Sequence, residues 1–305
     1  MNWKKVSIIG VVVLAAAALY GGYHQHQQTT AQRTQQTTST AAVASSSSAT
    51  SAAESSQAQA SSSQHNQRSQ AVQAILDQYR TQQNVGVVYT DLATNDTAAV
   101  NGGQAFYAAS VAKLPVVAYV QHAIMTGKIS WTTSFTYADA ANALPNAMVS
   151  GGTGTLQNEA HQGKAYTVED LTQRAIEQSD NQASNQLLYH VARANEQDFE
   201  TYLQSAIGTK TYSKTMSALQ ANQIIIKLWR QNQKASAWLE HTDWAQDKIG
   251  ALPVTVAHKI GINGAANNDT AIVLSPHEFT LTIMTTGWSD AQIADLAQQI
   301  YAVAK

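Results

Sequence analysis

The order in which strand-like and helix-like runs follow one another constrains the fold of this chain most. A helical pattern begins near Ala71, and strand-like runs follow at 84–92 and 97–100. Three more strand-like runs lie near the other end, at 254–263, 268–275 and 279–286, before a last helix at about 290–304. Helical patterns fill the middle, at 110–126, 167–178, 182–193, 196–206 and 217–231. Strands from both ends can pair in one sheet, so the sequence predicts an α+β domain: an antiparallel sheet flanked by terminal helices, plus an all-helical lobe.

The first 70 residues have a different character. Lys4 and Lys5 precede an uncharged run from Val6 to Tyr23, which as a helix spans about 27 Å, close to the thickness of a bilayer core. We interpret residues 1–23 as a membrane anchor with its N-terminus inside, and a cleaved signal peptide is the alternative. Residues 24–70 are nearly all Gln, Ser, Thr and Ala, so we expect a disordered linker.

The folded domain is therefore expected at 71–305, outside the cell and held to its membrane by one span, or secreted if the first segment is cleaved. Charged residues make up 12% of the chain, its net charge is −2, and Lys and Arg are scattered singly. This pattern argues against a nucleic-acid partner. The absence of cysteine excludes disulfides, thiolate metal sites and a cysteine nucleophile. The histidines show no metal-ligand spacing, so neither a metal nor a cofactor is predicted.

A serine and a lysine lie three residues apart in the apolar stretch A-A-S-V-A-K-L-P-V-V. Side chains with this spacing share one face of a helix, so Ser110 and Lys113 can meet. Pro115 is tolerated only near a helix start, which places Ser110 in the first turn, where free N–H groups favour a developing negative charge. A lysine becomes a base when burial or a second cation lowers its pKa. A lysine that extends to the surface is the simpler alternative.

Two further stretches are weak when taken alone. Q-S-D-N at 178–181 is typical of an ordinary turn after a helix. A-H-K-I-G at 257–261 places a lysine on a strand just before a glycine, where another backbone or a ligand can approach. The ordered set Ser-x-x-Lys, Ser-Asp-Asn and Lys-x-Gly is much more specific, because class A β-lactamases and penicillin-binding proteins share it. Residues 71–305 resemble the class A β-lactamase-like serine hydrolases.

This resemblance implies a role for each motif residue. Ser110 would be the nucleophile and Lys113 its proton acceptor. Ser179 would pass a proton to the leaving group, while Lys259 would hold that hydroxyl and the substrate carboxylate.

The same resemblance implies that Asn181 binds the substrate's side-chain amide and that Asp180 braces its loop. The backbone N–H groups of Ser110 and Ile262 would form an oxyanion hole, with Gly261 opening the strand beside it.

The chain departs from the family pattern at two places. The residue after Lys259 is usually Thr or Ser, and here Ile260 removes a hydroxyl that would bind the carboxylate, a loss of about 1.5–3 kcal/mol. Class A enzymes also carry a glutamate, in an E-x-x-L-N loop, that activates the water releasing the acyl group. The corresponding stretch here, T-K-T-Y-S-K-T-M at 209–216, contains no acid. Such an enzyme is expected to acylate and then stall.

Two classes of function remain open. One is an extracellular serine hydrolase near peptidoglycan that forms a Ser110 acyl-enzyme with β-lactams, or with acyl-D-alanyl wall peptides as a carboxypeptidase or transpeptidase does. The other is a degenerate cell-wall-binding module, which the sequence K-I-G and the missing glutamate would permit. The presence of all the motif residues together favours the enzyme, because a scaffold needs none of them.

Overall fold

The computed structural model describes residues 67–305. The predicted anchor, 1–23, and most of the predicted linker lie outside the described residues. Residues 67–76 form a helix that continues into a short 3₁₀ turn, η1 (Asp77–Tyr79), so residues 67–70 are helical where the sequence predicts linker. Within residues 67–305, no helix is both long and apolar enough to cross a bilayer.

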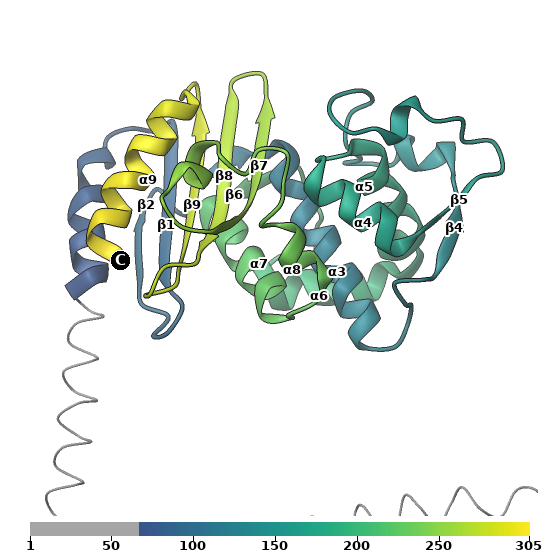
Figure 1. Cartoon of the computed structure of the whole chain (residues 1–305), viewed down its shortest axis with the longest axis horizontal. Helices are drawn as coiled ribbons and strands as arrows, with labels where there is room; N and C mark the ends of the chain where they lie inside the picture. The colour runs from purple at the N-terminus through teal and green to yellow at the C-terminus, as the bar shows by residue number, and fades with distance from the viewer. Residues whose placement is uncertain (1–66) are drawn as a thin grey trace, which may run out of the picture. The chain divides into compact units, whose positions relative to one another are not determined.

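A five-stranded antiparallel sheet forms one lobe. Its strands are β1 (Val85–Asp91), β2 (Thr97–Val100), β7 (Val256–Asn263), β8 (Ala266–Val273) and β9 (Phe279–Thr286). They pair in the order β2-β1-β9-β8-β7, so the two N-terminal strands join the three C-terminal ones through β1 and β9 (Figure 1). Strands from the two ends of the described chain therefore build one sheet, as the sequence predicts.

The two faces of the sheet pack against different partners because side chains alternate along each strand. Val85, Val87 and Tyr89 of β1 pack in a cluster with the terminal helices, whereas Val88 packs in a cluster with the helical lobe. The C-terminal helix α9 (Asp290–Ala304) begins at a capping box and lies beside the N-terminal helix on one face (Figure 1).

The second lobe is helical. Its helices are α3 (Leu114–Met125), α4 (Val168–Glu177), α5 (Asn181–Leu187), α6 (Glu196–Ile207), α7 (Ala218–Arg230) and α8 (Lys234–Trp238). Shorter turns are η2 (Ala109–Lys113), η3 (Asp139–Ala143), η4 (Leu156–Asn158), the π-helical η5 (Leu188–Ala192), η6 (Arg193–Asn195) and η7 (Lys248–Ala251). Helix α3 is buried from Leu114 through Gln121, and every residue of this run except Gln121 is apolar or aromatic. It therefore forms a rigid centre directly after η2.

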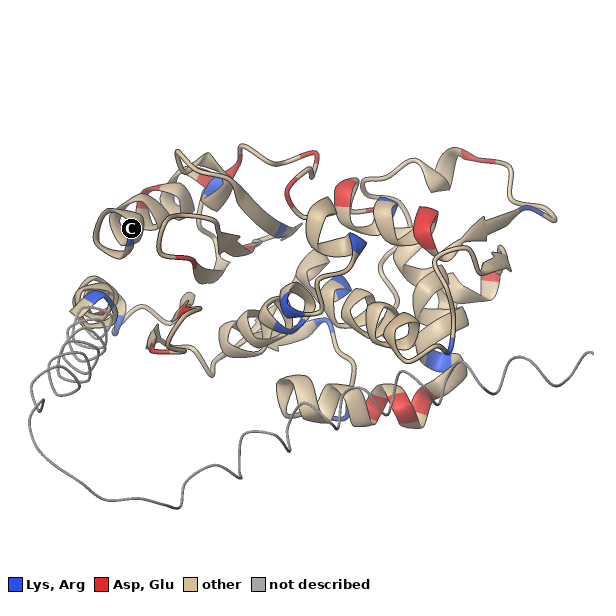
Figure 2. Ribbon diagram, turned by 60° about the horizontal axis from the view of Figure 1, so that its bottom comes forward, with Lys and Arg blue, Asp and Glu red and all other residues tan. Residues whose placement is uncertain are grey.

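Two small ribbons were not predicted from the sequence. One pairs β3 (Ala105–Tyr107) with β6 (Thr215–Ser217), and the other pairs β4 (Ser134–Thr136) with β5 (Ala165–Thr167). Strands of three residues carry too little alternation to stand out in a sequence. The β3–β6 ribbon positions the chain that enters η2. Lys and Arg are scattered along the described chain and form no continuous basic stretch (Figure 2).

Candidate active site

Ser110 lies in a short 3₁₀ turn, η2, and not in the first turn of the long helix that the sequence predicts. The preceding residue, Ala109, has φ +47°, a left-handed conformation that a side chain disfavours. Two backbone hydrogen bonds hold this turn: Ala108 N–H donates to Lys214 O at 2.7 Å, and Val111 N–H donates to Ala108 O at 3.1 Å. The strained turn leaves the Ser110 side chain partly exposed while its neighbours are buried.

The Lys113 side chain is buried beneath Ser110 and is only 1% exposed. Its Nζ donates to Ser110 Oγ at 2.8 Å, to Ser179 O at 2.6 Å and to Asn181 Oδ1 at 2.8 Å. Burial lowers the pKa of Lys113 well below its usual value, and the charge of Lys259 lowers this pKa further. A lysine whose pKa is lowered in this way is neutral over a wider range of pH than an ordinary lysine, and as the neutral amine it can accept a proton.

Ser179 and Asp180 form a tight turn between α4 and α5. Ser179 has φ +53°, and Lys113 Nζ donates to its hydroxyl oxygen at 3.0 Å. Asp180 is the N-cap of α5, and its carboxylate accepts hydrogen bonds from Ala183 N–H at 2.9 Å and Leu156 N–H at 2.8 Å. The turn is therefore fixed on both sides.

Lys259 reaches the same turn from strand β7. Its Nζ donates to Ser179 Oγ at 2.8 Å and to its neighbour's carbonyl, Ile260 O, at 3.2 Å. Burial lowers the pKa of Lys259 to about 7, against the opposing field of Asp269. Ser179 Oγ thus lies between two buried amines, which makes a continuous path for a proton from Ser110 through Lys113 to Ser179.

Gly261 lets strand β7 approach the serine turn. A Cβ at this position would lie 2.3 Å from Ala108 O and 3.1 Å from Ser110 N, so no other residue fits without a shift of backbone. The next residue, Ile262, is 52% exposed. Strand β7 therefore packs directly against the Ser110 turn, with its backbone close to the Ser110 nitrogen.

Ser110 opens into a cavity of about 340 Å³. The residues that line it come from η2, β7 and two loops, and they are Tyr107, Ala109, Ser110, Met148, Val149, Gly152, Thr153, Asn181, Ile262 and Asn263. None of these side chains is charged. In residues 67–305, no group of three or more His, Asp or Glu residues is arranged to hold a metal ion.

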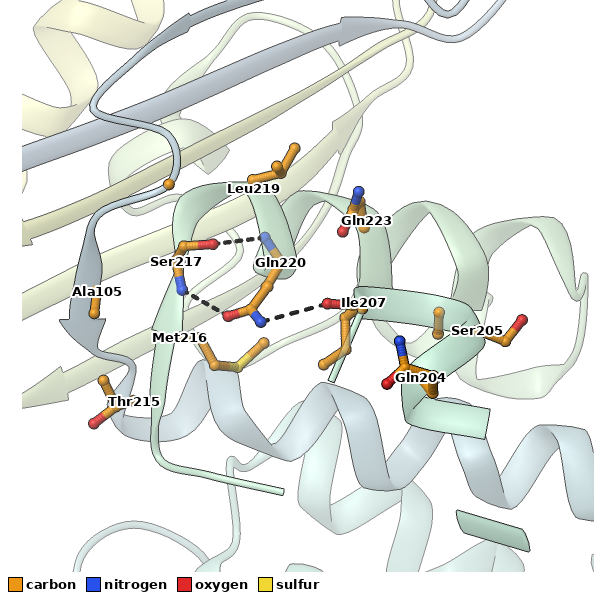
Figure 3. A pocket seen from close by; sticks show the side chains of 13 residues that line it. Ala105, Gln204, Ser205, Ile207, Thr215, Met216, Ser217, Leu219, Gln220 and Gln223 are labelled. Carbon is orange, nitrogen blue, oxygen red and sulfur yellow. Dashed lines mark hydrogen bonds between the residues drawn. The ribbon is translucent and has the colours of Figure 1, made fainter. Parts of the chain in front are cut away.

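A larger cavity of about 540 Å³ lies elsewhere, between α6, β6 and the start of α7 (Figure 3). Its lining has no titratable side chain. In a capping box, the side chains of Ser217 and Gln220 each accept a hydrogen bond from the other residue's backbone N–H. Gln220 Nε2 also donates to Ile207 O at 3.4 Å (Figure 3). This cavity and another of about 540 Å³ beside the start of α6 are both larger than the one at Ser110, but neither has a serine paired with a buried lysine. We therefore place the candidate active site at Ser110.

Comparison with known proteins identifies the family. A family model described as the beta-lactamase enzyme family matches residues 67–304. The chain belongs to this family. No curated protein sequence matches it.

Solved structures of β-lactamases and a related protein share its fold. A variant of PBP-A, described as an acyl-enzyme complex with penicillin G, matches with a TM-score of 0.63 and 18% identity, covering 76% of this chain and 95% of that one. An ancestral class A β-lactamase matches with a TM-score of 0.61 and 22% identity, covering 77% of this chain and 99% of that one. A β-lactamase from Burkholderia phymatum matches with a TM-score of 0.60 and 19% identity, covering 78% of this chain and 99% of that one. The predicted α+β fold of antiparallel sheet and helices is thereby confirmed.

Sequence reasoning missed one loop of this β-lactamase-family site, residues 149–154. Asn181 Nδ2 donates to Val149 O at 2.9 Å and to Gly151 O at 3.0 Å, which ties the loop to the turn after α4. A Cβ at Gly154, where φ is +100°, would lie 2.3 Å from the Asp180 carboxylate. The glycine-rich run S-G-G-T-G was the available signal, because backbones approach this closely only at glycine.

The acid-free stretch that the sequence analysis singled out lies next to this family member's cavity. Asn146 Nδ2 donates to Tyr212 O at 3.0 Å, and Lys214 Nζ donates to Ala147 O at 2.9 Å. The next residue, Met148, lines the cavity, and the Asn185 side chain bonds both its N–H, at 2.7 Å, and its carbonyl, at 3.0 Å. Beside this stretch, the cavity is therefore lined by Met148, whose backbone is held by Asn185, and not by a carboxylate.

Proposed function

We propose that this chain is a serine hydrolase that forms an acyl-enzyme at Ser110 with β-lactams and related acyl donors. One observation carries the proposal: Lys113 Nζ, a buried amine with a strongly lowered pKa, lies 2.8 Å from Ser110 Oγ. A hydroxyl becomes a nucleophile when a base within hydrogen-bond distance accepts its proton.

The contacts suggest how each group takes part in acylation. Neutral Lys113 takes the proton of Ser110 as its Oγ attacks the carbonyl carbon. The developing oxyanion is stabilised by backbone N–H groups of Ser110 and Ile262. Lys113, 3.0 Å from Ser179 Oγ, transfers a proton to Ser179, which delivers its own to the leaving nitrogen or oxygen. Lys259 holds the Ser179 hydroxyl at 2.8 Å throughout.

Release of the acyl group is expected to be slow. Hydrolysis needs a base that activates water, and none of the ten side chains that line the cavity carries a carboxylate. The similar PBP-A variant, described as an acyl-enzyme complex with penicillin G, supports this proposal for a chain of the same fold. We therefore assign acylation as the fast step and water attack as the slow one.

We also propose that the protein acts outside the cell, close to peptidoglycan, and is anchored by residues 1–23. Two lysines followed by an apolar run of membrane-spanning length support this location.

The direct test is intact-mass measurement of the purified full-length protein after incubation with benzylpenicillin. We expect one stable adduct of the mass of the whole penicillin, absent in Ser110→Ala. Turnover of a chromogenic cephalosporin would add measurable deacylation. If neither β-lactams nor acyl-D-alanyl peptides give a Ser110-dependent adduct or turnover, the enzyme proposal is wrong and a binding module remains.

A further inference from the structure

Three exposed apolar side chains lie around the cavity at Ser110. Residues 67–305 expose seven large hydrophobic side chains, and three of them, Tyr107, Val149 and Ile262, line the serine cavity. Val149 is 51% exposed and Ile262 is 52% exposed. Apolar side chains gathered around a cavity mark the contact surface of an apolar ligand.

No cation reaches into the cavity. Lys113 and Lys259 are each 1% exposed, and both direct their ammonium groups to protein oxygens. Ile260, the residue after Lys259, has no hydroxyl, is 5% exposed and does not line the cavity. A carboxylate placed in this cavity would lose its hydration without gaining a charged partner, which is costly.

The uncharged polar groups of the cavity also have partners within the protein. Both N–H groups of the Asn181 amide are used by Val149 O and Gly151 O, and its Oδ1 accepts from Lys113. Asn263 Nδ2 donates to Tyr107 OH at 3.3 Å. An amide in the substrate's acyl chain would have to displace the 149–154 loop to reach Asn181.

We propose that the cavity at Ser110 favours an uncharged, apolar acyl group, so that neutral esters of short apolar acids are better substrates than acyl donors bearing a carboxylate. The inference rests on the proposed acyl-enzyme chemistry. In the first step Ser110 Oγ forms a bond to the ester carbonyl carbon, the bond from that carbon to the alkoxy oxygen breaks, and the proton of Ser110 leaves with the alcohol. Water then adds to the Ser110 ester, which returns the serine and yields the free acid.

The test uses two chromogenic esters of similar length with the same leaving group, 4-nitrophenyl butyrate and 4-nitrophenyl hemisuccinate. The rate of the Ser110-dependent burst of 4-nitrophenolate is measured with the full-length protein, with Ser110→Ala as background. We expect the butyrate to acylate at least about tenfold faster than the hemisuccinate, the size of effect that one lost charge-assisted contact gives. Benzylpenicillin methyl ester should likewise acylate faster than benzylpenicillin.

A substitution at the cavity mouth distinguishes the effect of the cavity lining on substrate choice from the general reactivity of Ser110. Val149→Lys places a cation at the cavity mouth and should raise the hemisuccinate rate relative to the butyrate rate. Leu219→Lys changes an equally apolar, 42% exposed residue outside this cavity and should leave the ratio unchanged. Equal or faster acylation by the hemisuccinate in the unmodified protein overturns the substrate inference alone. Absence of any Ser110-dependent burst or adduct, with esters or β-lactams, overturns the proposed function and the inference with it.

Discussion

Ser179 accepts two hydrogen bonds from the Lys113 ammonium group, at 3.0 Å on its hydroxyl oxygen and at 2.6 Å on its carbonyl oxygen. The carbonyl bond bridges helix η2 and the turn after α4, and it helps to hold Ser179 at φ +53°. The backbone conformation of Ser179 and the position of the Lys113 side chain therefore depend on each other.

Replacing the base tests this arrangement. Lys113→Met keeps the length of the buried side chain but removes the proton acceptor and its bonds to Ser110 and Ser179. We expect acylation to slow by about 10²–10⁴-fold, the usual contribution of a general base. Single-turnover burst kinetics measure this loss. Lys210→Met, at an exposed position, is the control, and an unchanged rate in Lys113→Met would contradict the assigned role.

The rate of acylation should rise with pH. Lys113 reacts as the neutral amine, and its pKa is well below its usual value of 10.5, mainly through burial. The rising limb of the pH–rate profile should therefore end well below pH 10.5, as Lys113 loses its proton. A profile whose limb is centred near the pKa of an ordinary lysine would contradict a buried base.

Stability should also increase with pH above neutrality. Folded Lys259 loses its proton at about pH 7, whereas the unfolded side chain keeps it up to about pH 10.5. The unfolded state binds more protons between these values, so the unfolding free energy rises with pH by up to about 1.4 kcal/mol per unit, and this contribution is lost as the pH falls through 7. Urea unfolding of the protein and of Lys259→Met between pH 7 and 9.5 measures the slope, which should be smaller in the variant. Parallel slopes would show that Lys259 titrates normally.

Because β7 contacts the serine turn at Gly261, we expect replacement of this glycine to destabilise the protein more than replacement of a glycine in open space. Gly261→Ala would bring a methyl group to 2.3 Å from Ala108 O, so we expect a loss of about 1–3 kcal/mol in stability and slower acylation. Gly103→Ala is the control, because nothing lies within 4 Å of a Cβ there, and it should change stability by less than about 0.5 kcal/mol. Similar effects of the two substitutions on unfolding would refute the steric argument.

A carboxylate added to the cavity wall should shorten the life of the acyl-enzyme. Met148→Glu places a base beside the serine, on a backbone that Asn185 holds by two hydrogen bonds. We expect deacylation to accelerate by about 10²-fold or more if the new carboxylate activates water. The decay of the adduct mass with time gives the rate. Met148→Gln, similar in shape and without a charge, should decay as slowly as the unmodified protein.

The main features of the fold were predictable because long strands and helices carry clear periodicity. The five-stranded sheet, α9 and the long helix through Leu114–Met125 follow from alternation and apolar runs. The three-residue strands such as β3 and β6 were missed, since pairing between distant segments stabilises them and local pattern does not.

The sequence motifs pointed to residues that the fold brings together, but they gave no sign of what surrounds them. Ser110, Lys113, Ser179 and Lys259 are brought into one hydrogen-bonded chain. The attachment of Asn181 to the 149–154 loop was invisible, because it joins residues about 30 positions apart through backbone carbonyls. The apolar rim was missed for the same reason: Tyr107, Val149 and Ile262 come from three separate segments.

The close contact between Gly261 and the serine turn has a consequence for surveys of genomes. A search that demands Thr or Ser directly after the strand lysine would pass over this chain, since Ile260 stands there. The glycine one position further on is the residue for which the geometry allows no substitute. Surveys that keep this glycine and leave the preceding position open would recover other chains with the same contact between the strand and the serine turn.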